Sequence, residues 1–183
     1  MPDDVQRLVD STRIRDLMSR YARAVDRFDL EALRAVYHPD AHDDHGGYRG
    51  GVDGLLEYVA AQTASMRQVM HFLGQCLIEF AGADVAVCET YFMTAHTLGP
   101  GQRMYGAGGT GSPVQISMFG RYVDRVECRD GDWKIAERVV VFEATRLYTD
   151  EVPPLDPAWA QPSRDRDDPI YRLRAEAGLD PSR

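Results

Sequence analysis

The sequence predicts an α+β domain in which helices precede a sheet. Apolar residues recur at helical spacing in three early segments, which are residues 14–25, 30–37 and 52–63. Later segments are rich in Val, Ile, Phe, Tyr and Thr and are separated by turn residues; they are 68–80, 84–98, 113–128 and 132–146. Helices followed by consecutive strands are typical of an α+β fold with antiparallel pairing, whereas a parallel sheet would need alternating strands and helices.

The first helix has one apolar stripe, formed by Ile14, Leu17, Met18, Tyr21 and Val25. Charged residues fill its other faces, so the stripe is expected to face a core. We predict that this helix ends at Asp26.

The next two helices have recognisable boundaries. Asp29 suits the N-cap of a short helix over 30–37, because its carboxylate can accept from free amides of the first turn, and Pro39 then stops that helix. Helical spacing returns over 52–63, where Asp53 places negative charge near the helix start. Three N-terminal helices are therefore expected.

The last two strands show alternating polarity. In the first of them Ile116, Met118, Tyr122 and Val126 share one side, and in the second Trp133, Ile135, Val139 and Val141 do so. The opposite sides carry Arg121, Arg125, Lys134 and Arg138. A curved sheet could wrap its apolar face into a pocket, with the glycine-rich stretch 99–112 as a hairpin connection near the mouth.

Composition limits the classes of partner. The chain of 183 residues carries a formal charge of −8, so it lacks the basic surface that nucleic acid or an anionic membrane would require. No apolar run approaches the length of a membrane span, and a cytoplasmic protein with a small-molecule substrate is expected. The three scattered cysteines, Cys76, Cys88 and Cys128, are expected to be core residues and not a disulfide framework.

Asp26 and His71 are the strongest candidates for chemistry. Asp26 closes the first helix, and His71 opens a strand-like apolar stretch. A carboxylate that accepts from one imidazole nitrogen fixes the tautomer and leaves the other nitrogen as a base. If the two side chains meet, they form a proton-transfer site. Tyr21 could donate a proton there, although it could equally be a core aromatic of the helix stripe.

A cluster of metal-ligand residue types occupies residues 38–45. Its members are His38, Asp40, His42, Asp43, Asp44 and His45. A strand would send alternate side chains to opposite faces, so we favour a polar strand and turn over a metal site. The glycines of 106–111 form no phosphate-binding loop, because no helix and no Lys-Ser/Thr pair follows them.

Five segments together resemble the SnoaL-like branch of the nuclear transport factor 2 (NTF2-like) superfamily. They are Tyr21-Ala-Arg-Ala-Val-Asp26 with its continuation to Leu33, Tyr37-His-Pro-Asp-Ala-His-Asp-Asp-His-Gly46, Met70-His-Phe-Leu-Gly74, Gly120-Arg-Tyr-Val-Asp-Arg125 and Gly131-Asp-Trp-Lys-Ile-Ala-Glu-Arg138. The resemblance covers about residues 8 to 147. We therefore expect a SnoaL-like domain over 1–149 and a proline-rich extension over 150–183 that wraps the surface or a neighbouring subunit.

The resemblance implies a cone-shaped barrel, with helices packed on a strongly curved antiparallel or mixed sheet around an apolar pocket. Similar enzymes are of the scytalone dehydratase, bile acid 7α-dehydratase and hexachlorocyclohexane dehydrochlorinase types, which need no cofactor. By this resemblance His71 is the base, Asp26 orients it, and Tyr21 is the proton donor. His45 would contact substrate. A second histidine of the scytalone dehydratase type has no match around residues 117–121.

Three functions stay open at this stage. The first is a cofactor-independent lyase or isomerase acting on a small hydrophobic cyclic, polyketide-like or steroid-like substrate. The second is a polyketide cyclase, and the third is a non-catalytic binding or assembly module. We also expect Arg121 and Tyr91 to bind substrate, although Arg121 and Arg138 could each be solvated residues of the outer face. A homo-oligomer, either a dimer or a trimer, is expected.

Overall fold

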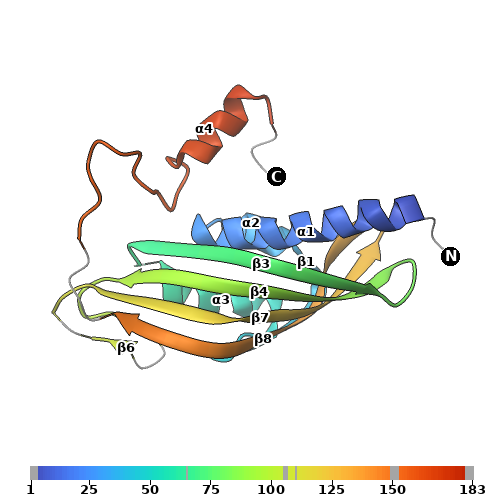
Figure 1. Ribbon diagram of the computed structural model, residues 1–183, viewed down its shortest axis with the longest axis horizontal. Helices are drawn as coiled ribbons and strands as arrows, with labels where there is room; N and C mark the ends of the chain where they lie inside the picture. Colours follow the sequence, from blue (N-terminus) through green and yellow to red (C-terminus); the bar gives the residue numbers. More distant parts are fainter. Residues whose placement is uncertain (1–3, 65, 105–106, 110, 149–152, 180–183) are drawn as a thin grey trace.

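The protein folds around one curled, mixed six-stranded sheet with helices packed beside it (Figure 1). The computed structural model describes residues 4–64, 66–104, 107–109, 111–148 and 153–179. The α+β prediction is confirmed, and the sheet curls without closing into a complete barrel.

The secondary structure follows the predicted order. The helices of the described chain are α1 (Asp4–Asp26), α2 (Leu30–Ala35), α3 (Val52–Thr63) and α4 (Pro169–Glu176). The strands of the main sheet are β1 (Tyr37–Asp44), β2 (Arg49–Gly51), β3 (Gln68–Phe80), β4 (Val85–Leu98), β7 (Val114–Arg129) and β8 (Asp132–Tyr148). A small hairpin, β5 (Arg103–Met104) with β6 (Ala107–Gly108), lies within the predicted glycine-rich connection.

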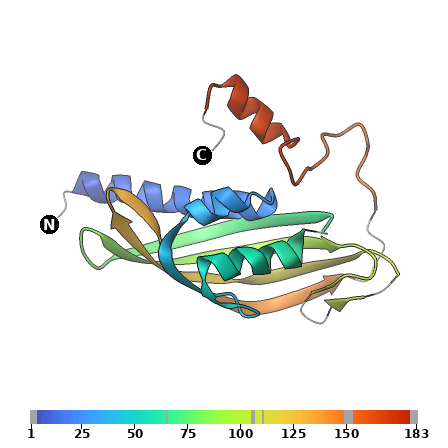
Figure 2. The ribbon, with the colours of Figure 1, turned by 180° about the vertical axis from the view of Figure 1, so that it is seen from behind.

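The sheet has the order β2-β1-β8-β7-β4-β3. Neighbouring strands are antiparallel except for β1 and β8, which are parallel. Figures 1 and 2 show α1 running alongside β3 while α3 lies across one face of the curled sheet. The space between these helices and the sheet is filled by the core, and one end of it holds the cavity described below.

The turn after α1 is tight and is held by local hydrogen bonds. Phe28 adopts φ +55°, a left-handed conformation that ends the helix and is uncommon for a residue with a side chain. Asp29 then caps α2, since its Oδ1 accepts from the amide of Ala32 at 3.0 Å, as predicted. The helix α2 ends at Ala35, earlier than predicted, because Tyr37 already pairs with β8.

A bulge in β8 changes which side chains face the core. Val126 pairs with Ile135 but Arg125 pairs with Glu137, so Ala136 is the extra residue. Beyond it the alternation shifts by one position, and Arg138 is fully buried while Val139 is 38% exposed. The predicted apolar face is therefore correct for Trp133 and Ile135 and wrong beyond the bulge.

Arg138 is the largest fully buried side chain, and Asp124 neutralises it. Its Nε and Nη2 donate to the two carboxylate oxygens of Asp124 at 2.7 and 2.8 Å, and Nη2 also approaches the sulfur of Met18 at 3.3 Å. Burial alone would lower the pKa of Arg138, but Asp124 and Tyr37 raise it well above its usual range. The pair is therefore an ion pair inside the core.

None of the helices in the described part of the chain combines the length and the apolar character that crossing a bilayer needs.

Removal of one partner from the buried ion pair should be costly. Asp124→Ala leaves Arg138 charged and unpaired, so we expect a loss of about 3–5 kcal/mol in the free energy of unfolding, measured by urea titration. The double variant Asp124→Leu with Arg138→Met should recover most of that loss because no buried charge is left. A single variant as stable as the double one would contradict this account.

Candidate active site

Asp26 and His71 meet, and one carboxylate holds both the backbone and the ring of the histidine. Asp26 Oδ1 lies 2.6 Å from His71 Nδ1, and Oδ2 accepts from the backbone amide of His71 at 3.0 Å. Both side chains are nearly buried, with exposures of 11% for Asp26 and 7% for His71. The helix end and the start of β3 are thereby fixed to each other at the predicted pair.

This geometry selects one tautomer of His71. An ionised carboxylate can only accept hydrogen bonds, so Nδ1 must carry the proton that lies between the two groups. In the neutral ring the lone pair is then on Nε2. Because Nδ1 faces Asp26 and the ring also lines the cavity, Nε2 is the atom available to a bound molecule.

The cavity beside His71 belongs to about 500 Å³ of empty space that includes open solvent at its mouth, and its walls are aromatic, aliphatic, hydroxyl, amide and imidazole groups. The lining residues are Tyr21, Val25, His45, Tyr58, Val59, Gln62, Thr63, His71, Phe92, Thr94, His96, Met104, Met118, Tyr122, Val140 and Phe142. Among them there is no Asp, Glu, Lys or Arg. The walls therefore suit an uncharged, largely apolar ring system.

Gly120 lets two of these walls come close together. A Cβ at this position would lie 2.3 Å from the carbonyl oxygen of Val141 and 2.8 Å from the ring of Phe92. Phe92 in turn stacks on Tyr122 with 4.4 Å between ring centroids. Glycine is needed here because strand and ring approach too closely for any side chain.

His96 is a second histidine in the cavity, next to His71. The two rings lie edge to face with centroids 5.9 Å apart. They come from neighbouring antiparallel strands, in which His96 pairs with Val69 and His71 pairs with Thr94. Neither ring nitrogen of His96 has a hydrogen-bond partner within the described protein, although the side chain is buried. Burial, and to a smaller extent His71 and Arg164, lower the pKa of His96 to about 3. A neutral imidazole is thus present, able to donate or accept.

Tyr21 lies in the cavity wall with the guanidinium of Arg138 behind it. The Arg138 guanidinium carbon is 4.0 Å from the ring centroid of Tyr21 and 4.2 Å from that of Tyr122. Burial raises the pKa of Tyr21 to about 12, although Arg138 opposes this rise. The Tyr21 hydroxyl is therefore protonated at neutral pH, and its role as a proton donor stays a prediction.

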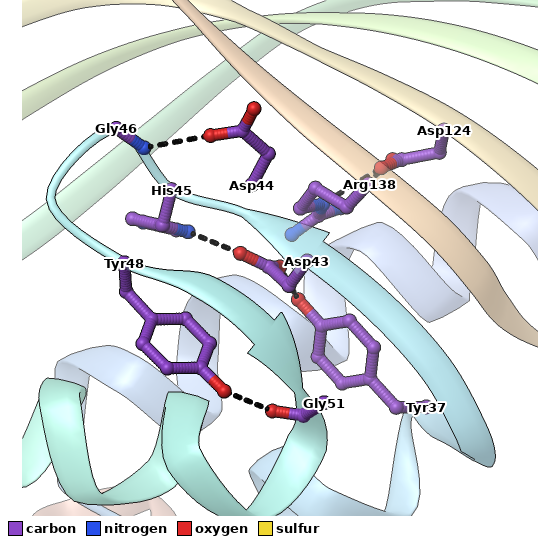
Figure 3. A network of polar contacts seen from close by, with 9 residues as sticks. All are labelled: Tyr37, Asp43, Asp44, His45, Gly46, Tyr48, Gly51, Asp124 and Arg138. Carbon is purple, nitrogen blue, oxygen red and sulfur yellow. Dashed lines mark hydrogen bonds and ion pairs between the residues drawn. The ribbon is translucent and has the colours of Figure 1, made fainter.

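His45 lines the cavity and is linked through Asp43 to the buried hydroxyl of Tyr37, as Figure 3 shows. Asp43 accepts from the Tyr37 hydroxyl at 2.8 Å, and its other oxygen is 3.1 Å from His45 Nδ1. The same reasoning as for His71 leaves Nε2 as the free nitrogen of this ring. The structure thus places His45 where a substrate contact was expected.

Arg121 and Tyr91 were predicted to bind substrate, but neither lines the cavity, so this prediction is wrong. Arg121 and Tyr91 pair with each other on the outer face of the sheet. Arg121 binds Glu89 and Glu143 there, and Tyr91 is 48% exposed. Both occupy odd positions of strands whose even positions face inward, so their side chains point away from the core.

The His- and Asp-rich strand β1 does not gather a metal site in the part of the chain that the structure describes. His38 contacts the carbonyl of Glu127, Asp40 binds Arg129, and Asp44 binds Arg49. Each of these three side chains therefore binds a different partner, and they do not converge on one point.

Comparison with known proteins agrees with this architecture. The family model of the SnoaL-like domain matches residues 6–139, which is most of the chain. The chain belongs to the SnoaL-like family. No curated protein matches the sequence.

Solved structures similar to this SnoaL-like protein include three of interest. A type 2 hexachlorocyclohexane dehydrochlorinase, LinA, has 21% identity and a TM-score of 0.71, over 86% of this chain and 100% of its own. A protein named as a candidate scytalone dehydratase, from Novosphingobium aromaticivorans, has 20% identity and a TM-score of 0.67, over 86% and 100%. A protein of unknown function from Mycobacterium tuberculosis has 23% identity and a TM-score of 0.60, over 93% and 94%. At these identities the likeness establishes the NTF2-like fold.

Sequence reasoning missed His96 as a site residue and placed Arg138 ambiguously. The signal for His96 was present, because it shares parity with Phe92 and Thr94 on β4, whose even positions are buried. The burial of Arg138 could not be read from alternation, because the bulge at Ala136 reverses the phase before it.

The buried neutral state of His96 should make this SnoaL-like protein sensitive to acid. The unfolded ring takes up a proton near pH 6.5 but the folded one only near pH 3, so the free energy of unfolding falls as pH drops between these values. The slope due to this residue approaches about 1.4 kcal/mol per pH unit. Urea titrations of His96→Leu across this range should show a flatter profile than the native protein, whereas His42→Leu, at an exposed position, should not. Superimposable profiles for native protein and His96→Leu would refute the assignment.

Proposed function

We propose that this protein is a cofactor-independent lyase that removes a proton from carbon in a small, uncharged cyclic substrate, with His71 as the base. The observation that carries the proposal is the Asp26–His71 pair, in which the carboxylate holds Nδ1 and leaves Nε2 toward a cavity. The relatives named as a dehydrochlorinase and a candidate scytalone dehydratase support elimination as the class of reaction.

Side chains of the cavity can account for every proton and electron pair that moves in the elimination. His71 Nε2 takes a proton from a carbon beside a carbonyl or an aromatic ring, and the C–H electron pair becomes the new double bond as the leaving group departs from the adjacent carbon. A hydroxyl group leaves as water when a donor protonates it, and we propose Tyr21, which lines the cavity, as that donor. A halide needs no proton and leaves as an anion. Asp26 keeps its own charge and stabilises the imidazolium that forms.

A positioned base contributes on the order of 10²- to 10⁴-fold to the rate, so other groups must stabilise the charge that develops on substrate. His96 is suited to this because its ring is neutral and neither nitrogen has a hydrogen-bond partner among the described residues. A substrate oxygen near His96 could accept a hydrogen bond from its ring, while the substrate carbon that loses its proton faces His71. The 5.9 Å between the two ring centroids is compatible with one ring of substrate touching both.

The substrate class follows from the walls. Phe92, Tyr122 and Phe142 offer ring faces and edges, and Met104 and Met118 offer adaptable apolar surface. A carboxylate or phosphate on the substrate would meet no Lys or Arg among these lining residues. We therefore propose hydrophobic cyclic alcohols, ketones or halides as substrates.

Isomerisation is the second candidate function, because the same base can return its proton to another carbon of the substrate. His96 favours this alternative, since its neutral ring could stabilise a dienolate between the two proton transfers. The two functions share His71 and differ in whether a group leaves.

The direct test replaces His71 with Gln, which keeps hydrogen-bonding capacity but removes the base. We expect turnover to fall by about 10²- to 10⁴-fold with folding intact. A suitable panel is scytalone for water loss, hexachlorocyclohexane for chloride release, and 2-tetralone in D₂O for exchange of the carbon-bound proton. His42→Gln, at an exposed position of β1, is the matched control and should keep native rates.

The outcomes separate the functions. Exchange of the tetralone proton without loss of a leaving group from any substrate would favour the isomerase. Ligand binding that is equally tight in native protein and His71→Gln, with no reaction in either, would indicate a binding module and refute the proposal.

A further inference from the structure

The C-terminal extension returns to the body of the protein and inserts Arg164 at the end of α1. Arg164 Nη2 donates to the carbonyl of Val25 and Nε to that of Asp26, both at 3.3 Å. Its Nη1 donates to the carbonyl of Thr63 and lies 3.4 Å from that of Met66. One guanidinium therefore joins the C-terminal end of α1 to that of α3.

Neighbouring residues of the extension anchor this contact to the same corner. Asp168 is buried, forms an ion pair with Arg27 at 3.2 Å, and caps α4 through the amide of Ile170. Asp29 holds the extension from the other side, since it pairs with Arg166 at 3.1 Å and accepts from the Tyr171 hydroxyl at 3.3 Å. Figure 1 shows the extension looping outward from the sheet before it returns to α4, which lies beside α1 and α2.

Arg164 binds carbonyls in the last turns of α1 and α3, those of Val25, Asp26 and Thr63, and the carbonyls of Val25 and Thr63 also accept from amides of the turns that follow. The last carbonyls of a helix also carry partial negative charge, so a cation is favourable there. The guanidinium carbon lies 5.5 Å from the ring centroid of Phe28, the residue in the left-handed conformation. Arg164 thus covers the strained turn that immediately follows Asp26.

The guanidinium of Arg164 binds the backbone of two cavity walls. Val25 lines the cavity from α1 and Thr63 lines it from α3, and Arg164 binds the backbone carbonyl of each. The backbone of Asp26 is held at its carbonyl by Arg164, while its side chain holds His71 on β3. A shift of this helix end would be transmitted directly to the base.

We propose that Arg164 is a positioning residue for the Asp26–His71 pair, acting through the backbone at the end of α1. The inference rests on the proposed function only for its kinetic effect. Loss of the guanidinium frees the last turn of α1, and Asp26 no longer holds the ring of His71 at hydrogen-bond distance and in line with a bound carbon acid.

The experiment compares Arg164→Ala, Arg164→Lys and Arg172→Ala in the full-length chain. Arg172 is a matched control because it lies on α4 and pairs only with Glu176 one turn away, among the contacts seen in the described chain. With whichever panel substrate the native protein turns over, Arg164→Ala should lower kcat by about ten- to a hundredfold with little change in KM, as expected for a misplaced base. Arg164→Lys, which keeps the charge but not the fork of donors, should be intermediate, and Arg172→Ala should match native protein.

A second measurement does not need activity. The proton between His71 Nδ1 and Asp26 should give a downfield resonance in ¹H NMR of the native protein, and in Arg164→Ala this resonance should broaden or move upfield. Native kcat together with an unchanged resonance in Arg164→Ala would overturn the proposal, as would an equal loss in Arg172→Ala. If Arg164→Ala fails to fold, Arg164→Lys decides by the same two readouts. If no substrate of the panel reacts with native protein, the proposed function fails and the resonance still tests the positioning role.

Discussion

A single carboxylate ties the first helix to the sheet, and the rest of the site depends on this contact. Asp26 accepts from the backbone amide of His71 with one oxygen and from its ring with the other, so strand position and ring orientation are fixed together. A loose histidine could rotate about its side-chain bonds and present either nitrogen to the cavity. The double contact removes that freedom before any substrate binds, and preorganisation of this kind is how a modest base becomes an effective one.

The electrostatics of the interior are arranged in layers. Arg138 and Asp124 neutralise each other behind the cavity, while the lining itself has no Asp, Glu, Lys or Arg. Burial keeps the pKa of Tyr21 at about 12 and that of His96 at about 3, so both are neutral at physiological pH. Neutral, preorganised donors such as these can stabilise negative charge as it develops on a substrate.

Sequence pattern was sufficient for most of the fold, and the family resemblance identified the central pair. The helical stripe ended at Asp26, the strand began near His71, and the N-cap at Asp29 lay where short-range chemistry placed it. What alternation could not reveal was the bulge at Ala136, because one inserted residue reverses the face of the residues that follow, up to a second register shift opposite Phe119 and Gly120, and brings Arg138 inside. Arg121 and Tyr91 were misplaced although no bulge intervenes. Their odd positions alternate with buried even positions, and this alternation alone assigns both side chains to the outer face. The contacts of Arg164 join residues over a hundred positions apart, which no local pattern encodes.

The tautomer of His71 tests the central claim most directly, because the base exists only if Nε2 carries the lone pair. ¹⁵N NMR of histidine-labelled protein above the pKa of the ring should show a protonated Nδ1 and an unprotonated Nε2 for His71, and Asp26→Asn, which can donate to the ring, should weaken or reverse that preference. A native spectrum in which Nε2 bears the proton would contradict the account.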